Sequence, residues 1–107
     1  MERYFDHERL LAYQLAAEVA RWLLHDARFP AGTASLRDQA VRAAQSAALN
    51  VAEGRARGGD AGRNHYRIAL GSAAEACAAL DLVVVVGAAE QQAKLRRVGA
   101  LVRGLVG

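Results

Sequence analysis

The chain has 107 residues, which is enough for one domain spanning 1–107, and 53% hydrophobic residues are ample for its core. Aromatic residues make up only 6%, and the apolar residues are mostly Ala, Leu and Val, a composition that favours helices over pleated sheets. The single cysteine, Cys77, excludes an internal disulfide and indicates a reducing compartment.

No segment has the features of a membrane span or of a secretory signal. The longest apolar run without a charge, residues 82–89, is far shorter than the roughly 20 residues that a membrane helix needs. The charged start at Met1–Arg3 is followed by Asp6, Glu8 and Arg9, which leaves no apolar signal-peptide core. The sequence therefore predicts a cytoplasmic protein with no membrane partner.

Positive charge is concentrated in the second half of the chain. The formal net charge is +3, and the sequence pI is about 9.6. Residues 1–54 contain six arginines and seven acids, whereas residues 55–107 contain eight basic residues and four acids. Most of the basic residues are arginines, which are suited to bidentate phosphate contacts.

The first helix is predicted over residues 6–27. Leu11, Leu15, Val19 and Trp22 recur every three or four residues and are expected to form its core stripe. Charged residues with the same period indicate that the opposite face is exposed.

The second helix is predicted over residues 34–57, after a connection that contains the only proline, Pro30. Thr33 or Ser35 is expected to cap its N-terminus with a side-chain oxygen. One face of this helix has almost no side-chain bulk and suits close helix packing, being formed by Ala40, Ala43, Ala44, Ala47, Ala48 and Val51. This face looks too extensive for one monomer core, which suggests helix packing between subunits.

A polar stripe runs along the same helix. Its residues are spaced three or four apart and so lie on one side: Arg42, Ser46, Asn50, Glu53 and Arg57. Two interpretations stay open: a solvated face with a Glu53–Arg57 pair, or a polar seam between subunits.

The third helix is predicted over residues 61–86 and the fourth over residues 88–103. Glycines around Asp60 mark the connection before the third helix, and Asp60 is a candidate cap. The third helix has an apolar stripe at bundle spacing, comprising Tyr66, Leu70, Ala73, Cys77, Leu80 and Val84. Val83–Val86 also suits a buried strand, but the chain offers no partner strand, so we expect helix up to Gly87.

The fourth helix carries its apolar residues on one side and its basic residues on the other. The inner side is formed by Leu95, Val98, Val102 and Leu105, and the outer side by Lys94, Arg96, Arg97 and Arg103. Cations in this position also complement the negative end of the helix dipole. Four helices with short connections predict an all-α fold, an up-down-up-down antiparallel four-helix bundle.

The chain contains no recognisable catalytic or metal constellation. The three histidines have no ligand partner at helical spacing, and no phosphate-cradling glycine motif follows a strand. Cys77 is expected to be a small buried hydrophobe, and Glu75 to hydrogen-bond Ser72 or an arginine of a neighbouring helix. We therefore predict a protein that is not an enzyme, with no metal and no cofactor.

The strongest functional candidate is a basic cluster around the connection between the second and third helices: Arg55, Arg57, Arg63 and Arg67. Its guanidinium groups are placed to project from one end of the bundle toward phosphates. The alternative is a solvated loop whose charges only provide solubility.

Several segments resemble a bacterial four-helix-bundle family encoded in intervening sequences of 23S rRNA genes. The similar residues are Asp6–Leu10, Arg42–Ser46, Asn50–Gly54 with Arg57, and Ile68–Glu75, in which Ser72 and Glu75 belong to a Gly-Ser-x-x-Glu motif. The resemblance covers most of residues 5–86. The chain departs from the family at Val41, where an arginine is common, at Ala48, where a proline is common, and in a shorter glycine-rich connection. The missing proline predicts a straighter second helix.

The resemblance implies a ring-like homopentamer. It extends to the accessory variability protein of diversity-generating retroelements, a basic pentamer that partners a reverse transcriptase and binds nucleic acid. The leading hypothesis, motivated by the excess positive charge of the second half, is a homo-oligomer that binds RNA or DNA backbone without base specificity. The contacts are expected from the basic cluster and Lys94, Arg96, Arg97 and Arg103, with steep salt dependence. The alternative is an oligomeric scaffold for a protein partner.

Overall fold

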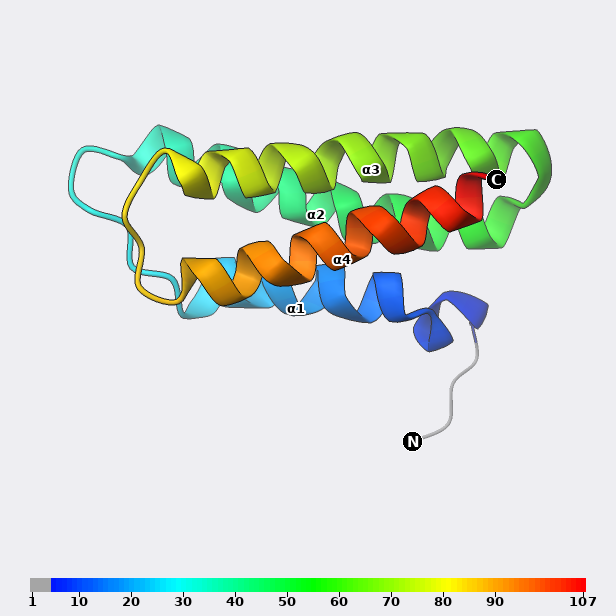
Figure 1. Cartoon of the computed structure of the whole chain (residues 1–107), viewed down its shortest axis with the longest axis horizontal. Helices are drawn as coiled ribbons and strands as arrows, with labels where there is room; N and C mark the ends of the chain where they lie inside the picture. Colours follow the sequence, from blue (N-terminus) through cyan, green and yellow to red (C-terminus); the bar gives the residue numbers. More distant parts are fainter. Residues whose placement is uncertain (1–4) are drawn as a thin grey trace.

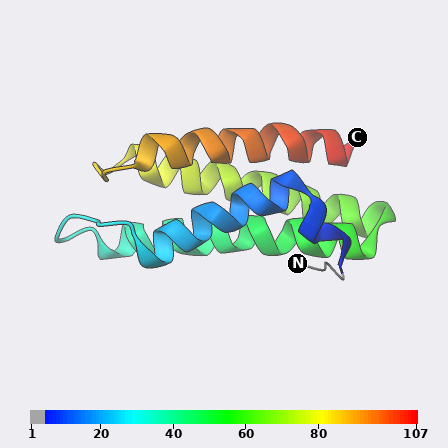
Figure 2. The same cartoon turned by 90° about the horizontal axis from the view of Figure 1, so that it is seen from below.

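The chain folds into four antiparallel helices preceded by a short 3-10 helix (Figure 1). The computed structural model describes residues 5–107. The elements are η1 (Asp6–Arg9), α1 (Leu11–His25), α2 (Ala34–Arg57), α3 (Gly59–Asp81) and α4 (Ala88–Val106). Helix α2 packs against α1 and α3, and α4 closes the bundle by packing against the same two helices (Figure 2). The predicted all-α four-helix bundle is confirmed.

The N-terminal helix is shorter than predicted. Leu10 has an extended backbone, with φ −75° and ψ 124°, and separates η1 from α1. The Gln14 amide donates a hydrogen bond of 2.9 Å to the Glu8 carbonyl, which holds the two elements together. The charged start at Met1–Arg3, part of the case against a signal peptide, lies outside the described residues.

The third helix ends at Asp81, so the prediction of helix as far as Val86 is wrong. Residues 82–87 form a loop instead, and its last residue, Gly87, has a left-handed conformation directly before α4. Val84, predicted to lie in the apolar stripe, is 88% exposed. An α-helix disfavours consecutive β-branched residues such as Val83–Val86, because their side chains lose rotamer freedom in it. The Gln92 amide of α4 also binds the last turn of α3, donating to the Cys77 carbonyl and to Asp81 Oδ1.

Neither predicted N-terminal cap forms. Thr33 occupies the cap position of α2, but its hydroxyl donates to the Pro30 carbonyl within the preceding turn, and Ser35 lies inside the helix. Gly58, not Asp60, precedes α3, and Asp60 pairs instead with Arg63. Both polar groups therefore serve local contacts in or beside the turns.

The core stripe of α1 differs from the predicted one. Leu11 is exposed, Leu15 and Trp22 are half-buried, and only Val19 is fully buried among the predicted four. The buried face comprises Ala12, Ala16, Ala17, Val19, Ala20 and Leu23. Alanine is only weakly apolar, so a buried face made largely of alanine gives a weak periodic signal. The larger apolar residues beside it, such as Leu11, are then easily taken for the core.

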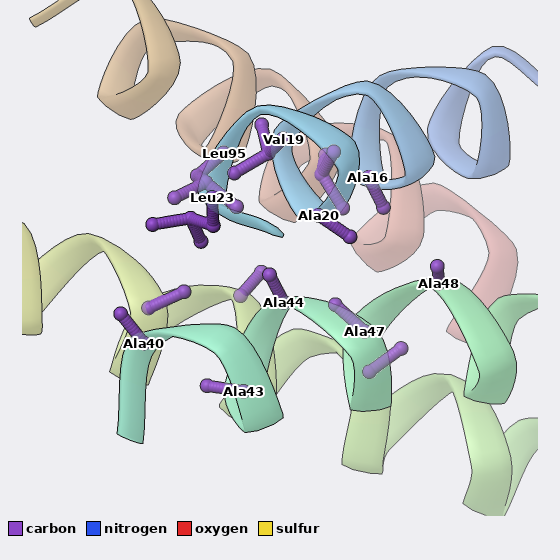
Figure 3. Close-up of a cluster of buried hydrophobic side chains, with 14 of the residues drawn as sticks. Ala16, Val19, Ala20, Leu23, Ala40, Ala43, Ala44, Ala47, Ala48 and Leu95 are labelled. Carbon is purple, nitrogen blue, oxygen red and sulfur yellow. The ribbon is translucent and has the colours of Figure 1, made fainter. Parts of the chain in front are cut away.

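The alanine face of α2 is buried within the single chain. Its six predicted residues are each at most 6% exposed. Figure 3 shows Ala16, Ala20 and Leu23 of α1 facing alanines of α2. The inference that this face is too extensive for one core is therefore wrong. Small residues on both helices let the backbones approach closely, and α2 continues without interruption through Ala48.

The inner side of α4 agrees with the prediction. Val98 and Val102 are completely buried, Leu95 is almost so, and Leu105 is half-buried. Together with α1 and α2 they form one continuous core.

Candidate nucleic-acid interface

A tight glycine turn between α2 and α3 places the basic cluster at one end of the bundle. Gly58, with φ +66°, is the only residue between the two helices. Gly54 and Gly62 lie inside α2 and α3, where the two helices cross. A Cβ atom at Gly62 would lie 2.5 Å from the Gly54 carbonyl oxygen, so this crossing requires glycine.

Three of the four cluster arginines lie beside a carboxylate. Arg57 Nε donates to Glu53 Oε2 at 2.8 Å, and Arg63 pairs with Asp60. Arg55 lies 4.0 Å from Asp6 in η1. Across residues 5–107, Arg67 forms no ion pair. Arg63 is half-buried and the other groups are exposed, so the carboxylates reduce the local positive potential without removing the guanidinium groups from solvent.

Two pKa shifts show how the cluster acts on its neighbours. The hydrogen bond and charge of Arg57 lower the pKa of Glu53, and His65 contributes in the same direction. Burial raises the pKa of Tyr66, whose ring fills the space beside Gly54, while the neighbouring Arg55 opposes that rise. Glu53 and Tyr66 thus keep their ordinary charges near neutral pH, negative and neutral.

The α4 cations differ in their immediate surroundings. Lys94 Nζ lies 3.3 Å from Glu18 Oε2 of α1 and 4.0 Å from Glu90 Oε1. Arg97 borders a hollow against Leu11 and Leu15 of α1. Arg96 and Arg103 line a separate groove between α3 and α4. Helix α4 ends at the same end of the bundle as the α2–α3 turn, so Arg103 in its last turn lies toward the basic cluster (Figure 1).

Three of the family-motif polar residues, Ser46, Asn50 and Ser72, form a hydrogen-bonded seam between α2 and α3. Ser46 Oγ and Ser72 Oγ are 2.7 Å apart, and the Asn50 amide donates to both the carbonyl and the hydroxyl of Ser46. Asn50 Oδ1 lies 2.8 Å from His65 Nδ1. Because the Asn50 amide oxygen can only accept a hydrogen bond, His65 Nδ1 is the donor in this contact.

Only the solvated-face interpretation of the polar stripe has a counterpart in the single chain, and a polar seam between subunits stays a prediction. The predicted Glu53–Arg57 pair is present, while Ser46 and Asn50 form a seam within one chain. Arg42 and Glu75 are exposed and form no ion pair among the described residues. Glu75 also has no hydrogen bond to Ser72, so its expected role is wrong.

Sequence reasoning missed the contact of His65 with Asn50 and the groove between α3 and α4. Small residues on the outer sides of both helices, such as Ala74 and Gly99, were the available signal for the groove. No signal in the sequence indicated the histidine contact, because it depends on how α2 and α3 are rotated about their axes relative to each other.

Within residues 5–107, no group of three or more His, Cys, Asp or Glu side chains could hold a metal ion. Over the same residues, none of the helices combines the length and the apolar character of a membrane span. Burial raises the pKa of the Cys77 thiol, which disfavours the thiolate form that a nucleophile requires.

Comparison with known families agrees with the motifs. The model of the 23S rRNA-intervening sequence protein family matches residues 8–99. The chain belongs to this family. In this 23S rRNA-intervening sequence protein the matched region contains all four cluster arginines and the complete α2–α3 seam, while Arg103 lies beyond it. A comparison with curated proteins gave no match.

Proposed function

We propose that this 23S rRNA-intervening sequence protein is a non-enzymatic homo-oligomer that binds the RNA or DNA backbone at the α2–α3 end of the bundle. The observation that carries the proposal is the position of Arg55, Arg57, Arg63 and Arg67 around one glycine turn. Arginine guanidinium groups bind phosphate oxygens in bidentate geometry. Since phosphate contacts release counterions, affinity is expected to fall steeply with salt.

Self-association would strengthen such binding, because several basic ends would act on one nucleic acid. The alanine face of α2 is buried within the monomer and cannot supply the contact. The α3–α4 loop is a better candidate, because Leu82, Val84 and Val86 are each at least 76% exposed. The family resemblance implies a pentamer, and the likeness to the accessory variability protein adds to the nucleic-acid proposal.

A matched pair of quadruple variants tests the interface. Arg55, Arg57, Arg63 and Arg67 are changed to Gln in one protein. In the control, the exchanged arginines lie outside the cluster: Arg21, Arg28, Arg37 and Arg42. Both proteins lose the same charge. Fluorescence anisotropy with a short structured RNA and a duplex DNA should show at least about tenfold weaker binding for the cluster variant alone.

The slope of log K against log salt should also become shallower in the cluster variant, by roughly one for each lost phosphate contact. Equal weakening by the two variants would contradict a localised interface and leave only net charge. Light scattering coupled to size exclusion checks assembly. The cluster variant should keep the oligomer, whereas Val84→Thr with Val86→Thr should reduce it.

A second candidate is an oligomeric scaffold for a protein partner without any role in nucleic-acid binding. The observation that favours it is the presence of Glu53, Asp60 and Asp6 beside three cluster arginines. If the wild-type protein changed the anisotropy of neither nucleic acid at any salt concentration, this candidate would be favoured over the first.

A further inference from the structure

A groove runs between α3 and α4 on the outside of the bundle. Its volume is about 460 Å³, and a set of small side chains forms most of its floor: Ala73, Ala74, Cys77, Ala78, Gly99 and Ala100. A Cβ atom added at Gly99 would meet only the end of Leu70, at 3.6 Å. The floor is therefore apolar and nearly without bulk, and it leaves room for another backbone to approach.

The edges of the groove are positively charged. Arg96 and Arg103 line it from α4, and neither forms an ion pair with any residue between 5 and 107. The one acidic group in the lining, Asp81, accepts a hydrogen bond of 2.7 Å from the Gln92 amide. An occupant thus meets apolar contact in the middle and two available guanidinium groups at the edge.

This combination fits a protein helix better than a nucleic acid. A phosphate backbone gains nothing from an apolar floor, and no aromatic side chain lines the groove to stack on bases. An amphipathic helix buries an apolar stripe in such a groove and keeps charged residues at its sides. The lining of α3 spans Leu70–Asp81, about three helical turns and ~16 Å, which is a usual length for such a contact.

The charges also argue against a second copy of this chain as the occupant. The chain has a net charge of +3, so its copies repel at an arginine-lined edge. Most acids on its helices already pair with its own cations, as Glu18, Glu53 and Asp60 do. We propose that the groove between α3 and α4 binds an acidic amphipathic helix of a partner protein.

Cys77 gives a direct reporter of occupancy, because it is the only cysteine and lies in the groove. The probe is a designed helical peptide of about 16 residues, with Leu and Ala on one face and Glu along both sides. A matched peptide carries Lys in place of Glu. Alkylation of Cys77 by iodoacetamide, followed by mass spectrometry at mildly alkaline pH, should slow at least about fivefold with saturating Glu peptide and stay unchanged with Lys peptide.

Variants with close controls locate the site. Arg96→Glu with Arg103→Glu should weaken peptide binding, measured by anisotropy, about tenfold or more, whereas Arg97→Glu on another side of α4 should change it little. Ala100→Trp should block the groove, whereas Ala89→Trp, at an exposed position outside it, should not. Circular dichroism verifies the fold, and the charge variants carry the test if Ala100→Trp does not fold.

Three results would overturn the proposal. Equal protection by the Glu and Lys peptides would remove the role of the arginines. Protection by a structured RNA but not by the Glu peptide would make the groove a nucleic-acid site. A third result would be protection of Cys77 that increases with protein concentration in the absence of peptide. If Ala100→Trp abolished both this protection and the oligomer, the occupant would be a second copy of the chain. The cluster variant of the RNA experiment retains Arg96 and Arg103, so the two proposals fail independently.

Discussion

The two sides of α3 are built from similar small residues but pack in different ways. Toward α2 the contact is closed: Gly54 lies against Gly62, and Ser46 is hydrogen-bonded to Ser72. Toward α4 the contact stays open along Ala74 and Gly99, where a groove remains. Small side chains alone therefore do not decide whether two helices meet closely.

The position of α4 explains the difference. Leu95, Val98 and Val102 point into the core and hold α4 at the distance that their own volumes require. The outer residues of α3 and α4 are too small to fill the remaining space. At the α2–α3 crossing, by contrast, two glycines face each other, so the backbones themselves are in contact.

The largest expected effect comes from adding one methyl group to the closed contact. Gly62→Ala would place a Cβ atom 2.5 Å from the Gly54 carbonyl oxygen, and a backbone atom cannot move aside cheaply. We expect a loss of about 2 kcal/mol in the free energy of unfolding, after the helix propensity gained by alanine. Urea unfolding followed by circular dichroism measures it. A gain in stability would show that the crossing is looser than described.

The same substitution in the open contact should act in the opposite direction. Gly99→Ala adds a methyl group at ordinary contact distance from Leu70, so alanine's better helix propensity should raise the free energy of unfolding by roughly 0.5–1 kcal/mol. Gly71→Ala, with open space around it, is the control and should give a similar gain. Both are compared with wild type at equal protein concentration, since assembly affects apparent stability. A loss confined to Gly99→Ala would mean that the groove is filled.

Hydrophobic period predicted the elements whose large residues dominate one face. The inner side of α4 was predictable from Leu95, Val98 and Val102, because these large apolar residues recur at helical spacing and are buried in the core. The period failed in α1, where alanines outnumber larger residues and the exposed Leu11 was mistaken for core. It also failed at Val84, because the end of α3 depends on Gln92, a residue of another helix.

Contacts within one helix were predictable, but those between helices were not. Glu53–Arg57 follows from a spacing of four residues, which brings two side chains together on any helix. His65–Asn50 and Arg55–Asp6 join residues far apart in the chain. The groove likewise required the separation of α3 and α4, which the sequence does not state.

The smallest expected effect concerns charge at the outer edge of the closed contact. Arg57 lowers the pKa of Glu53, so Arg57→Gln should raise that pKa toward its ordinary value. Because the folded-state pKa is lowered, the interaction stabilises the fold above the unfolded-state pKa and is lost as pH falls through the folded-state value. Arg57→Gln should remove this part of the pH dependence.

NMR titration of the Glu53 side chain measures the midpoint directly. Arg42→Gln is the control, because Arg42 lies on the same stripe of α2 without an ion pair among residues 5–107, and its removal should leave the Glu53 midpoint in place. An equal shift in both variants would mean that Glu53 responds to the general field of the helix and not to Arg57. Arg57 at the edge of the closed contact would then have no specific partner in Glu53, just as Arg96 and Arg103 of the open groove form no ion pair among residues 5–107.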